Sequence, residues 1–324
     1  MTKVAGAGSD IFAAPRTART VLRLHRIALV VWGLSVVVLC ARLVWLAEVT
    51  AKEERKALDA CGASQDWCDP TMAGMPGYEA GIGWTGWLIS HAFLAVAAFA
   101  GGALIGRELE NGTAHLAWTQ GVTPARWLTA KLAVPALAVT AGATVLVLVY
   151  RWAARDDRDP MYDPWSGDAF VSRGPAVAAY ALCALAVGAL AALLVRRALP
   201  ALAVSVTATG LLGFALARYR GSLWPTVTAT SRSEDVDRPF TAWETESGAV
   251  VHGRRVPYFD AFGCDGPRAR MRACLDDLGV SRFYVTYHPE SHYRPIHLVE
   301  TGVVLAVAAL AALAAYWLLR RRTA

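Results

Sequence analysis

Six long apolar runs constrain the fold of this chain more than any other feature. A transmembrane helix needs about 20 mostly apolar residues to cross about 30 Å of hydrocarbon, and each run is close to that length. The runs are residues 27–46, 84–106, 132–150, 175–195, 198–217 and 298–319. The chain of 324 residues is 55% hydrophobic, which is unusual for a soluble domain. We therefore predict an all-α polytopic membrane protein with six transmembrane helices.

Basic residues in the short loops set the expected orientation, because cytoplasmic loops carry an excess of Lys and Arg. The bases that flank one set of helix ends are Lys3, Arg16, Arg19, Arg23, Arg26, Arg107, Arg126, Lys131, Arg196, Arg197, Arg320, Arg321 and Arg322. This side is expected to be cytoplasmic, so both termini lie inside and the protein spans the plasma membrane several times. The net charge of +6 then reflects topology and anionic membrane lipid, and no nucleic-acid partner is expected.

The predicted spans divide the chain into four regions. Residues 1–26 form a cytoplasmic tail, whose four arginines at three- and four-residue spacing fit either an interfacial amphipathic helix or a simple positive flank. Residues 27–217 hold spans 1–5 and include a cytoplasmic loop at 107–131. Residues 218–297 form a long extracytoplasmic loop or lid between spans 5 and 6. Residues 298–324 hold span 6 and a basic cytoplasmic tail.

The long extracytoplasmic loop has weak signals for structure of its own. Residues 250–256 and 282–287 have strand character, and residues 269–278 are expected to form a short helix. The loop is long enough for a small domain but has few core residues, so disulfide bonds would support it.

The cytoplasmic loop carries dense signals for helix ends. Gly112 can end the second span, and Thr113 can cap a short helix at 114–120, because a Thr hydroxyl accepts an orphan backbone N–H. Gly121 closes that helix. Thr123 then stands at the N-cap of the next helix, and a proline follows at its first position, where a missing N–H costs nothing. The loop is thus predicted to comprise a helix end, a short helix and a helix start.

The string R-E-L-E-x-G-T, a short helix and then T-P-x-R-W-x-x-x-K-L, at residues 107–132, resembles the first cytoplasmic loop of type-2 ABC exporter permeases. The likeness is greatest to the six-span permeases of actinobacteria, and E-T-G at residues 300–302 adds a weaker match. The resemblance implies the membrane-spanning subunit of an exporter that works by alternating access with a separate ABC ATPase. It also implies a homodimer, or a heterodimer with a sister permease. An ordinary interhelical loop whose charges mark the inner surface is the alternative.

In the resembled family this loop touches the ATPase and passes on its motion. The residues implied to act in this coupling are Arg107, Glu108, Glu110, Gly112, Thr113, Trp118, Thr123, Arg126 and Lys131. Glu108 and Glu110 lie at the end of a helix, where a carboxylate is unfavourable by a few tenths of a kcal/mol or more. We predict that Arg107, Arg126 or a basic group on the ATPase offsets this cost.

No G-x-x-x-x-G-K-[ST] motif occurs in the sequence, so ATP hydrolysis is expected on the partner chain and not on this one. ATP and Mg are therefore expected on that ATPase, and no cofactor on this chain. His288, Glu290, His292 and His297 cluster before span 6, but H-x-E-x-H is not the H-E-x-x-H of zinc proteases, and no metal site is predicted. A membrane hydrolase that uses these histidines is a distant option.

The substrate is expected to be amphipathic or hydrophobic, because the predicted spans hold few charges. A non-transporting membrane protein whose outer loop senses or binds an extracellular ligand is the main alternative function. A P-loop ATPase in the neighbouring reading frame would favour the permease.

Three residues of the types Arg, His and Glu lie within the predicted spans. Arg42 and Glu300 are expected at similar depth below the outer surface, and His91 lies about two turns into span 2. A charge in the membrane costs much less when it is paired. We therefore predict a contact between Arg42 and Glu300, directly or through His91.

Four cysteines fall outside the predicted spans and two, Cys40 and Cys183, fall within them. Four cysteines allow three pairings. Because short loops close easily, we favour a Cys61–Cys68 bond and a Cys264–Cys274 bond over the other pairings, with four free thiols as the alternative.

Overall fold

The computed structural model describes residues 26–62, 77–155, 165, 167–260, 264 and 267–323. The chain forms two compact units. The first lies within Met1–Tyr162, Ser166–Leu216 and Glu300–Ala324, and the second within Asp163–Trp165 and Ala217–Val299. The arginine-rich segment that was expected to form an amphipathic helix before residue 26 lies outside the described residues.

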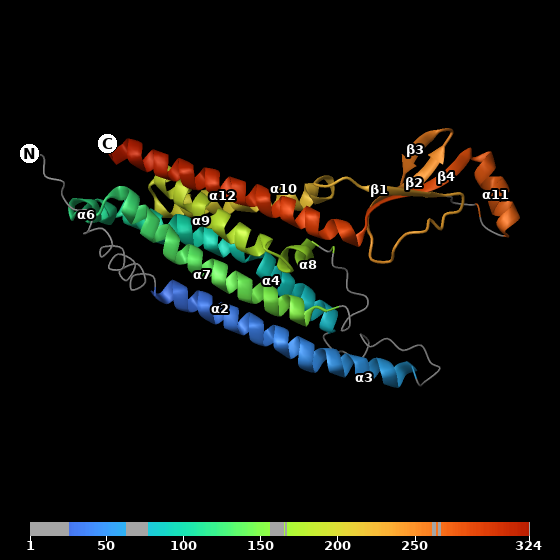
Figure 1. Ribbon diagram of the computed structural model, residues 1–324, viewed down its shortest axis with the longest axis horizontal. Coiled ribbons are helices and arrows are strands. Elements are labelled where there is room, and N and C mark those ends of the chain that lie inside the picture. The colour runs from blue at the N-terminus through green and yellow to red at the C-terminus, as the bar shows by residue number, and fades with distance from the viewer. Residues whose placement is uncertain are drawn as a thin grey trace, which may run out of the picture. The chain divides into compact units, whose positions relative to one another are not determined.

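The first unit is a bundle of long helices (Figure 1). Its elements are α2 (Arg26–Trp45), η1 (Leu46–Thr50, π-helical), α3 (Ala51–Gly62), α4 (Tyr78–Ala98), η3 (Phe99–Gly106, π-helical), α5 (Arg107–Glu110), α6 (Thr113–Thr119), α7 (Pro124–Ala153), α8 (Gly167–Ser172), α9 (Ala176–Val195) and the greater part of α10 (Ala198–Tyr219) and of α12 (Tyr293–Thr323). The last residues of α10, from Ala217, and the first of α12, to Val299, belong to the second unit. Six continuous helices in the described residues are long and apolar enough to cross a membrane. Each overlaps one of the six apolar runs, so the prediction of six candidate spans is confirmed.

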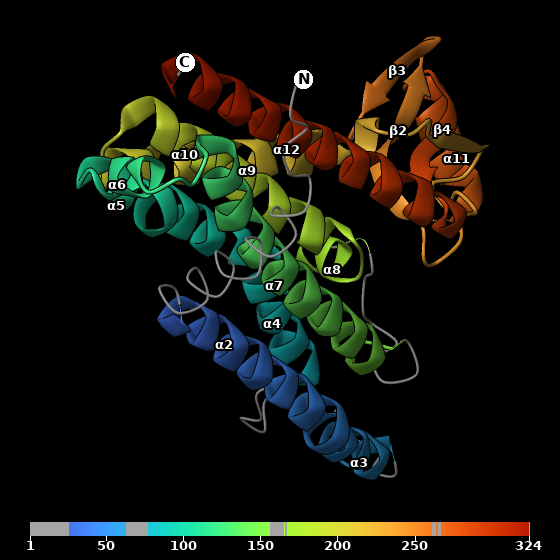
Figure 2. The same ribbon diagram turned by 60° about the vertical axis from the view of Figure 1, so that its left-hand side comes forward.

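Helix α9 lies at the centre of the bundle. In the most apolar stretch of 18 residues in α9, 72% of the residues are buried inside the structure. In the corresponding stretch of the first span, Arg26–Lys56, only 6% are buried. Its sequence is rich in Ala, and small residues let helix backbones approach closely in lipid. Helices α2 and α12 lie on opposite sides of the bundle, with α4, α7 and α9 between them (Figures 1 and 2).

The second unit contains a four-stranded antiparallel sheet with strand order β1-β4-β2-β3. The strands are β1 (Val227–Ser231), β2 (Trp243–Val251), β3 (Arg254–Pro257) and β4 (Val280–His288), and the unit also holds the helices α11 (Arg268–Asp277), η4 (Arg220–Ser222) and η5 (Glu290–His292). Its core contains Val236, Ala249, Leu275, Val280, Phe283 and Val285.

The prediction of an all-α protein is wrong for this unit. Strands β2 and β4 have nine residues each, but the alternation of apolar and polar residues along them is too irregular to predict a sheet from the sequence. The single strand expected at 250–256 is two strands, because His252 (φ 48°) and Gly253 (φ 76°) form a tight turn between β2 and β3. Two residues with positive φ are typical of a two-residue hairpin turn. The helix expected at 269–278 is confirmed as α11.

One of the two expected disulfide bonds is present. Cys264 and Cys274 are bonded, with their Cα atoms 5.6 Å apart, and both pack against the core of the second unit. The side chains of Cys61 and Cys68 lie outside the described residues, so that pairing stays a prediction.

Candidate functional site

The segment between α5 and α7 begins with a sharp change of backbone direction. Gly112 has a φ of +70°, the left-handed conformation that glycine adopts without steric cost, and α6 starts at the next residue. Thr113 was expected to cap α6, and this expectation is wrong. It is instead the first helical residue, and its hydroxyl donates a hydrogen bond of 3.3 Å back to the carbonyl oxygen of Glu108.

The C-terminal end of α6 follows the predicted pattern. Gly121 has a φ of +87°, and the N–H of Val122 donates to the carbonyl oxygen of Ala117 at 3.3 Å, the six-to-one bond of a Schellman motif. Thr123 then caps α7, since its hydroxyl oxygen accepts from the N–H of Arg126 at 3.4 Å, and a proline occupies the first helical position. Helix α6 is therefore a short segment with a left-handed glycine at each end.

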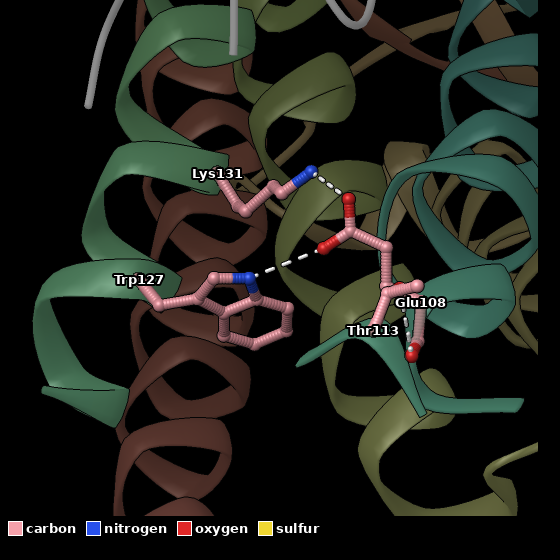
Figure 3. A network of polar contacts seen from close by, with 4 residues as sticks. All are labelled: Glu108, Thr113, Trp127 and Lys131. Carbon is pink, nitrogen blue, oxygen red and sulfur yellow. Dashed lines mark hydrogen bonds and ion pairs between the residues drawn. The ribbon is translucent and has the colours of Figure 1, made fainter. Parts of the chain in front are cut away.

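The carboxylate of Glu108 connects α5 to α7 (Figure 3). One oxygen, Oε1, lies 2.5 Å from the ammonium nitrogen of Lys131, and the other accepts a hydrogen bond of 3.1 Å from the indole N–H of Trp127. Trp127 and Lys131 are one helical turn apart on α7, so both side chains reach the same carboxylate. The side chains of Lys131 and Glu108 are 4% and 18% exposed. A pair this well buried is costly to break, because removing one partner leaves the other charge uncompensated.

The carboxylate of Glu110 connects α5 to α10. It accepts a hydrogen bond of 2.8 Å from the backbone N–H of Ala198, the first residue of α10. The N-terminus of a helix has orphan N–H groups and a partial positive charge, and both favour an anion. The contacts described for the two glutamates are thus with Trp127, Lys131 and Ala198 rather than with Arg107 or Arg126, and the third expected partner, a basic group on an ATPase, stays a prediction. Lys131 and Ala198 lie 23 and 88 residues away in sequence, where local charge spacing gives no signal.

Aromatic packing attaches α6 to α7. The ring of Trp118 meets the ring of Trp127 edge-to-face at 5.8 Å between centroids, and His115 meets Trp118 at 4.6 Å. Ala114 is fully buried, whereas Leu116 on the same short helix is 61% exposed. Helix α6 thus packs through one face and exposes an apolar side chain on another.

The polar residues of the predicted spans do not form the expected contact. Arg42 on α2 donates from Nε to the hydroxyl of Thr85 at 3.0 Å, and Glu300 on α12 accepts from the hydroxyl of Tyr180 at 2.9 Å. His91 bonds within α4 and stacks on Trp87. The prediction of an Arg42–Glu300 pair is wrong because α2 and α12 lie on opposite sides of the bundle (Figures 1 and 2).

Two of the clustered histidines meet in the second unit. The Nδ1 atoms of His288 and His292 are 3.2 Å apart, and His288 Nε2 donates to the carbonyl oxygen of Gly221 at 3.0 Å. Burial lowers the pKa of His288, the nearby His292 lowers it further, and the bond to Gly221 opposes both effects. His297 stacks on Tyr293 instead. Among the described residues no group of three or more metal-ligating side chains occurs.

Sequence reasoning named Glu108, Glu110 and Lys131 but missed Trp127 and Ala198, which contact them. The four-residue spacing of Trp127 and Lys131 was a usable signal, since it places both on one face of α7. The contact of Glu110 with the start of α10 had no such signal.

The comparison with known families identifies the same part of the chain. The family described as ABC-2 membrane transporter related matches residues 33–220, which is more than half of the chain and includes α5, α6 and α7. No curated protein and no solved structure matches the chain. Six apolar helices and this match make the chain a membrane transporter subunit, and it belongs to the ABC-2 membrane transporter related family.

Proposed function

We propose that this chain is the permease subunit of an ABC exporter and that α6 is the helix through which a separate ABC ATPase moves it. The ATPase binds ATP and Mg, and the permease changes between inward- and outward-facing states as the ATPase hydrolyses ATP. In this proposal α6 and both termini are cytoplasmic, the protein lies in the plasma membrane, and a second permease chain completes the pore. The cargo is amphipathic or hydrophobic.

The observation that carries this proposal is that α5, the end of span 2 that directly precedes α6, is attached to spans 3 and 5. Glu108 fixes the end of span 2 to span 3 through Lys131 and Trp127, and Glu110 fixes it to the start of span 5. Because α5 is held by these contacts and α6 packs on α7, a displacement of α6 is expected to move the attached helices rather than only the connecting loop. It reaches the ends of spans 2, 3 and 5 together, as coupling to an ATPase requires.

The exposed side chain of Leu116 supplies the contact surface for the partner. An apolar side chain that is 61% exposed, on a helix that also carries His115 and Trp118, is suited to a pocket on a soluble partner. Leu137 on α7 is 73% exposed but lies within the apolar span, where lipid covers it in this proposal. These two leucines give a matched pair for a test.

The test places a photo-crosslinking amino acid at Leu116 or at Leu137 and co-expresses the chain with an ABC ATPase that is encoded in a neighbouring reading frame or that co-purifies with the chain. Illumination should join permease and ATPase only from position 116. Without a crosslink from position 116, in a chain that is inserted and expressed normally, the coupling role is wrong. A sensing or binding role of the second unit, which has its own core, then becomes the better explanation.

A further inference from the structure

The second span changes its helical form just before the glutamates that contact α7 and α10. Residues Phe99–Gly106 are π-helical, and the N–H of Arg107 donates to the carbonyl oxygen of Gly102, five residues earlier. The π-helix is rare and occurs mostly as single turns, frequently at functional sites. A segment of eight residues in this form lies between α4 and α5 of one continuous span.

This π-helical segment packs backbone against backbone on its neighbours. A Cβ atom built on Gly101 would lie 2.5 Å from Ser205 Oγ and 2.8 Å from the carbonyl oxygen of Ala201, both on α10. On the other side, a Cβ atom on Gly188 of α9 would lie 2.6 Å from Ala100 Cβ. Glycine is required on both sides of the contact. At these glycine positions the segment itself presents no side chain to α9 or α10, whereas its Leu104 and Ile105 are fully buried and would have to repack if the segment turned.

Ser205 holds the junction between the α-helical and π-helical parts. Its hydroxyl lies 2.8 Å from the carbonyl oxygen of Ala97 and 2.9 Å from that of Leu202, and its side chain is fully buried. The hydroxyl has one proton, so it can donate to α4 or to its own helix α10. This gives α10 one weak and exchangeable bond to the start of the π-helical segment.

We infer that Phe99–Gly106 is a register switch in the second span, which converts between π-helix and α-helix as the permease changes state. A π-helical turn holds about one residue more than an α-helical turn. When such a turn becomes α-helical, the residues that follow it shift by about one residue along the helix, which is a rotation of about 100° about the helix axis and a translation of about 1.5 Å. Glu108 and Glu110 follow immediately, so the conversion turns both carboxylates relative to α9 and α10. The inference rests on the proposed function, because α6 supplies the displacement that drives the conversion.

A reversible crosslink tests this switch. A Cβ atom built on Gly102 lies 3.4 Å from Leu202 Cβ, close to the range of about 3.5–4.5 Å in disulfides. The double variant Gly102→Cys/Leu202→Cys, with Cys40 and Cys183 replaced by Ala, should therefore form a disulfide that locks the π-helical segment to α10. The readout is ATP hydrolysis by the complex with its ATPase in lipid nanodiscs, and Gly102→Cys alone is the control.

Oxidation should lower hydrolysis by the double variant at least about tenfold, the size expected for a coupling free energy, and reduction should restore it. Full hydrolysis by the oxidised complex, or failure of the disulfide to form, overturns the inference. If the reduced complex neither assembles with the ATPase nor hydrolyses ATP faster than the ATPase alone, the proposed function fails instead.

A deletion separates a register change from rigid movement of the whole span. A π-turn holds one extra residue, so deletion of the exposed Ala103 should leave α4 and α5 in place and fix the α-helical form. Deletion of the equally lipid-exposed Leu137 from the α-helical α7 should abolish assembly. The complex that lacks Ala103 should assemble but hydrolyse ATP slowly. Hydrolysis at the rate of the unmodified complex, or loss of assembly as with Leu137, contradicts the switch.

Discussion

The carboxylate of Glu110 accepts a hydrogen bond of 2.8 Å from the backbone N–H of Ala198, so the end of one helix binds the beginning of another. This contact offsets the unfavourable position of Glu110 at the C-terminus of its own helix. A carboxylate at a helix N-terminus contributes typically about 0.3–1 kcal/mol. The contact is therefore weak enough to open during a working cycle and strong enough to fix the resting state.

Replacing Glu110 should weaken the coupling between the permease and the ATPase in the proposed complex without unfolding the permease. We expect Glu110→Ala to keep normal expression and insertion, since it removes at most about 1 kcal/mol, while hydrolysis by the complex falls. Glu110→Gln keeps a hydrogen-bond acceptor and should retain more activity than Glu110→Ala. Both are measured by ATP hydrolysis beside an expression blot. Full activity of Glu110→Ala would show that this contact plays no part in coupling.

The buried pair of Glu108 and Lys131 should behave differently, because it contributes to folding. We expect Lys131→Met to lower the free energy of unfolding by about 3–5 kcal/mol, since it leaves an uncompensated buried carboxylate. The double variant Glu108→Gln/Lys131→Met removes both charges and keeps an oxygen acceptor for the indole N–H of Trp127. It should recover most of the loss. Thermal unfolding of the purified chain in detergent measures both, and equal losses in the single and double variants would contradict a buried pair.

Gly112 should tolerate only residues that accept a left-handed backbone. Gly112→Val places a β-branched side chain at a φ of +70°, which costs about 1–2 kcal/mol. We expect this variant to displace α6 and to lower ATP hydrolysis, whereas Gly112→Asn should retain most of it because Asn enters this region more readily. No atom lies within 4 Å of a Cβ atom built on Gly112, so steric contact with neighbouring residues should not contribute to the difference in ATP hydrolysis between the two variants. Equal activity of the two variants would exclude a backbone cause.

The sequence predicts the elements of this fold better than their mutual positions. Apolar length predicts the six spans, the two glycines predict the ends of α6, and Thr123 with the following proline predicts the start of α7, although Thr113 does not cap α6 as expected. The pairing of Arg42 with Glu300 failed because depth in the membrane gives one coordinate of a residue and not its angular position around the bundle. Glu108 and Lys131 were both named, but their contact depends on how α5 and α7 pack. The sheet depends on strand pairings such as Thr230 with Tyr284, which no local pattern specifies.

The Cys264–Cys274 bond should stabilise the second unit locally. Closing a short loop contributes about 2–4 kcal/mol by restricting the unfolded chain, and Cys264 lies in the unit's small core while Cys274 packs against it. We expect Cys274→Ala to increase hydrogen exchange in α11 and β4 of the full-length protein while α7 and α9 stay protected. Mapping of peptides under non-reducing conditions checks the bond itself, and recovery of both cysteines as alkylated thiols would contradict it.

The buried His288 should make the second unit sensitive to acid. The elements around it carry several charged or titratable groups, among them His292 and Glu290 on η5, Arg220 on η4, Glu244 and Glu246 on β2 and Arg294 on α12. Only His292 lowers its pKa by charge, and burial is the larger cause.

Because its Nε2–H donates to the carbonyl of Gly221, a neutral His288 presents a bare Nδ1 to His292, and protonation of both rings would place two donors face to face. The pKa of His288 is lower in the folded state than the usual value of about 6.5. The unfolded state therefore binds more protons below about pH 6.5, and stability should fall as pH falls through that value toward the lower folded pKa. The protection factors of the β4 amides, in which the slower intrinsic exchange at lower pH is divided out, should fall between pH 7.5 and pH 5.5 in the intact chain. His288→Gln, which keeps a donor for Gly221 but does not titrate, should remove most of this fall. An unchanged fall in His288→Gln would assign the acid sensitivity to another group.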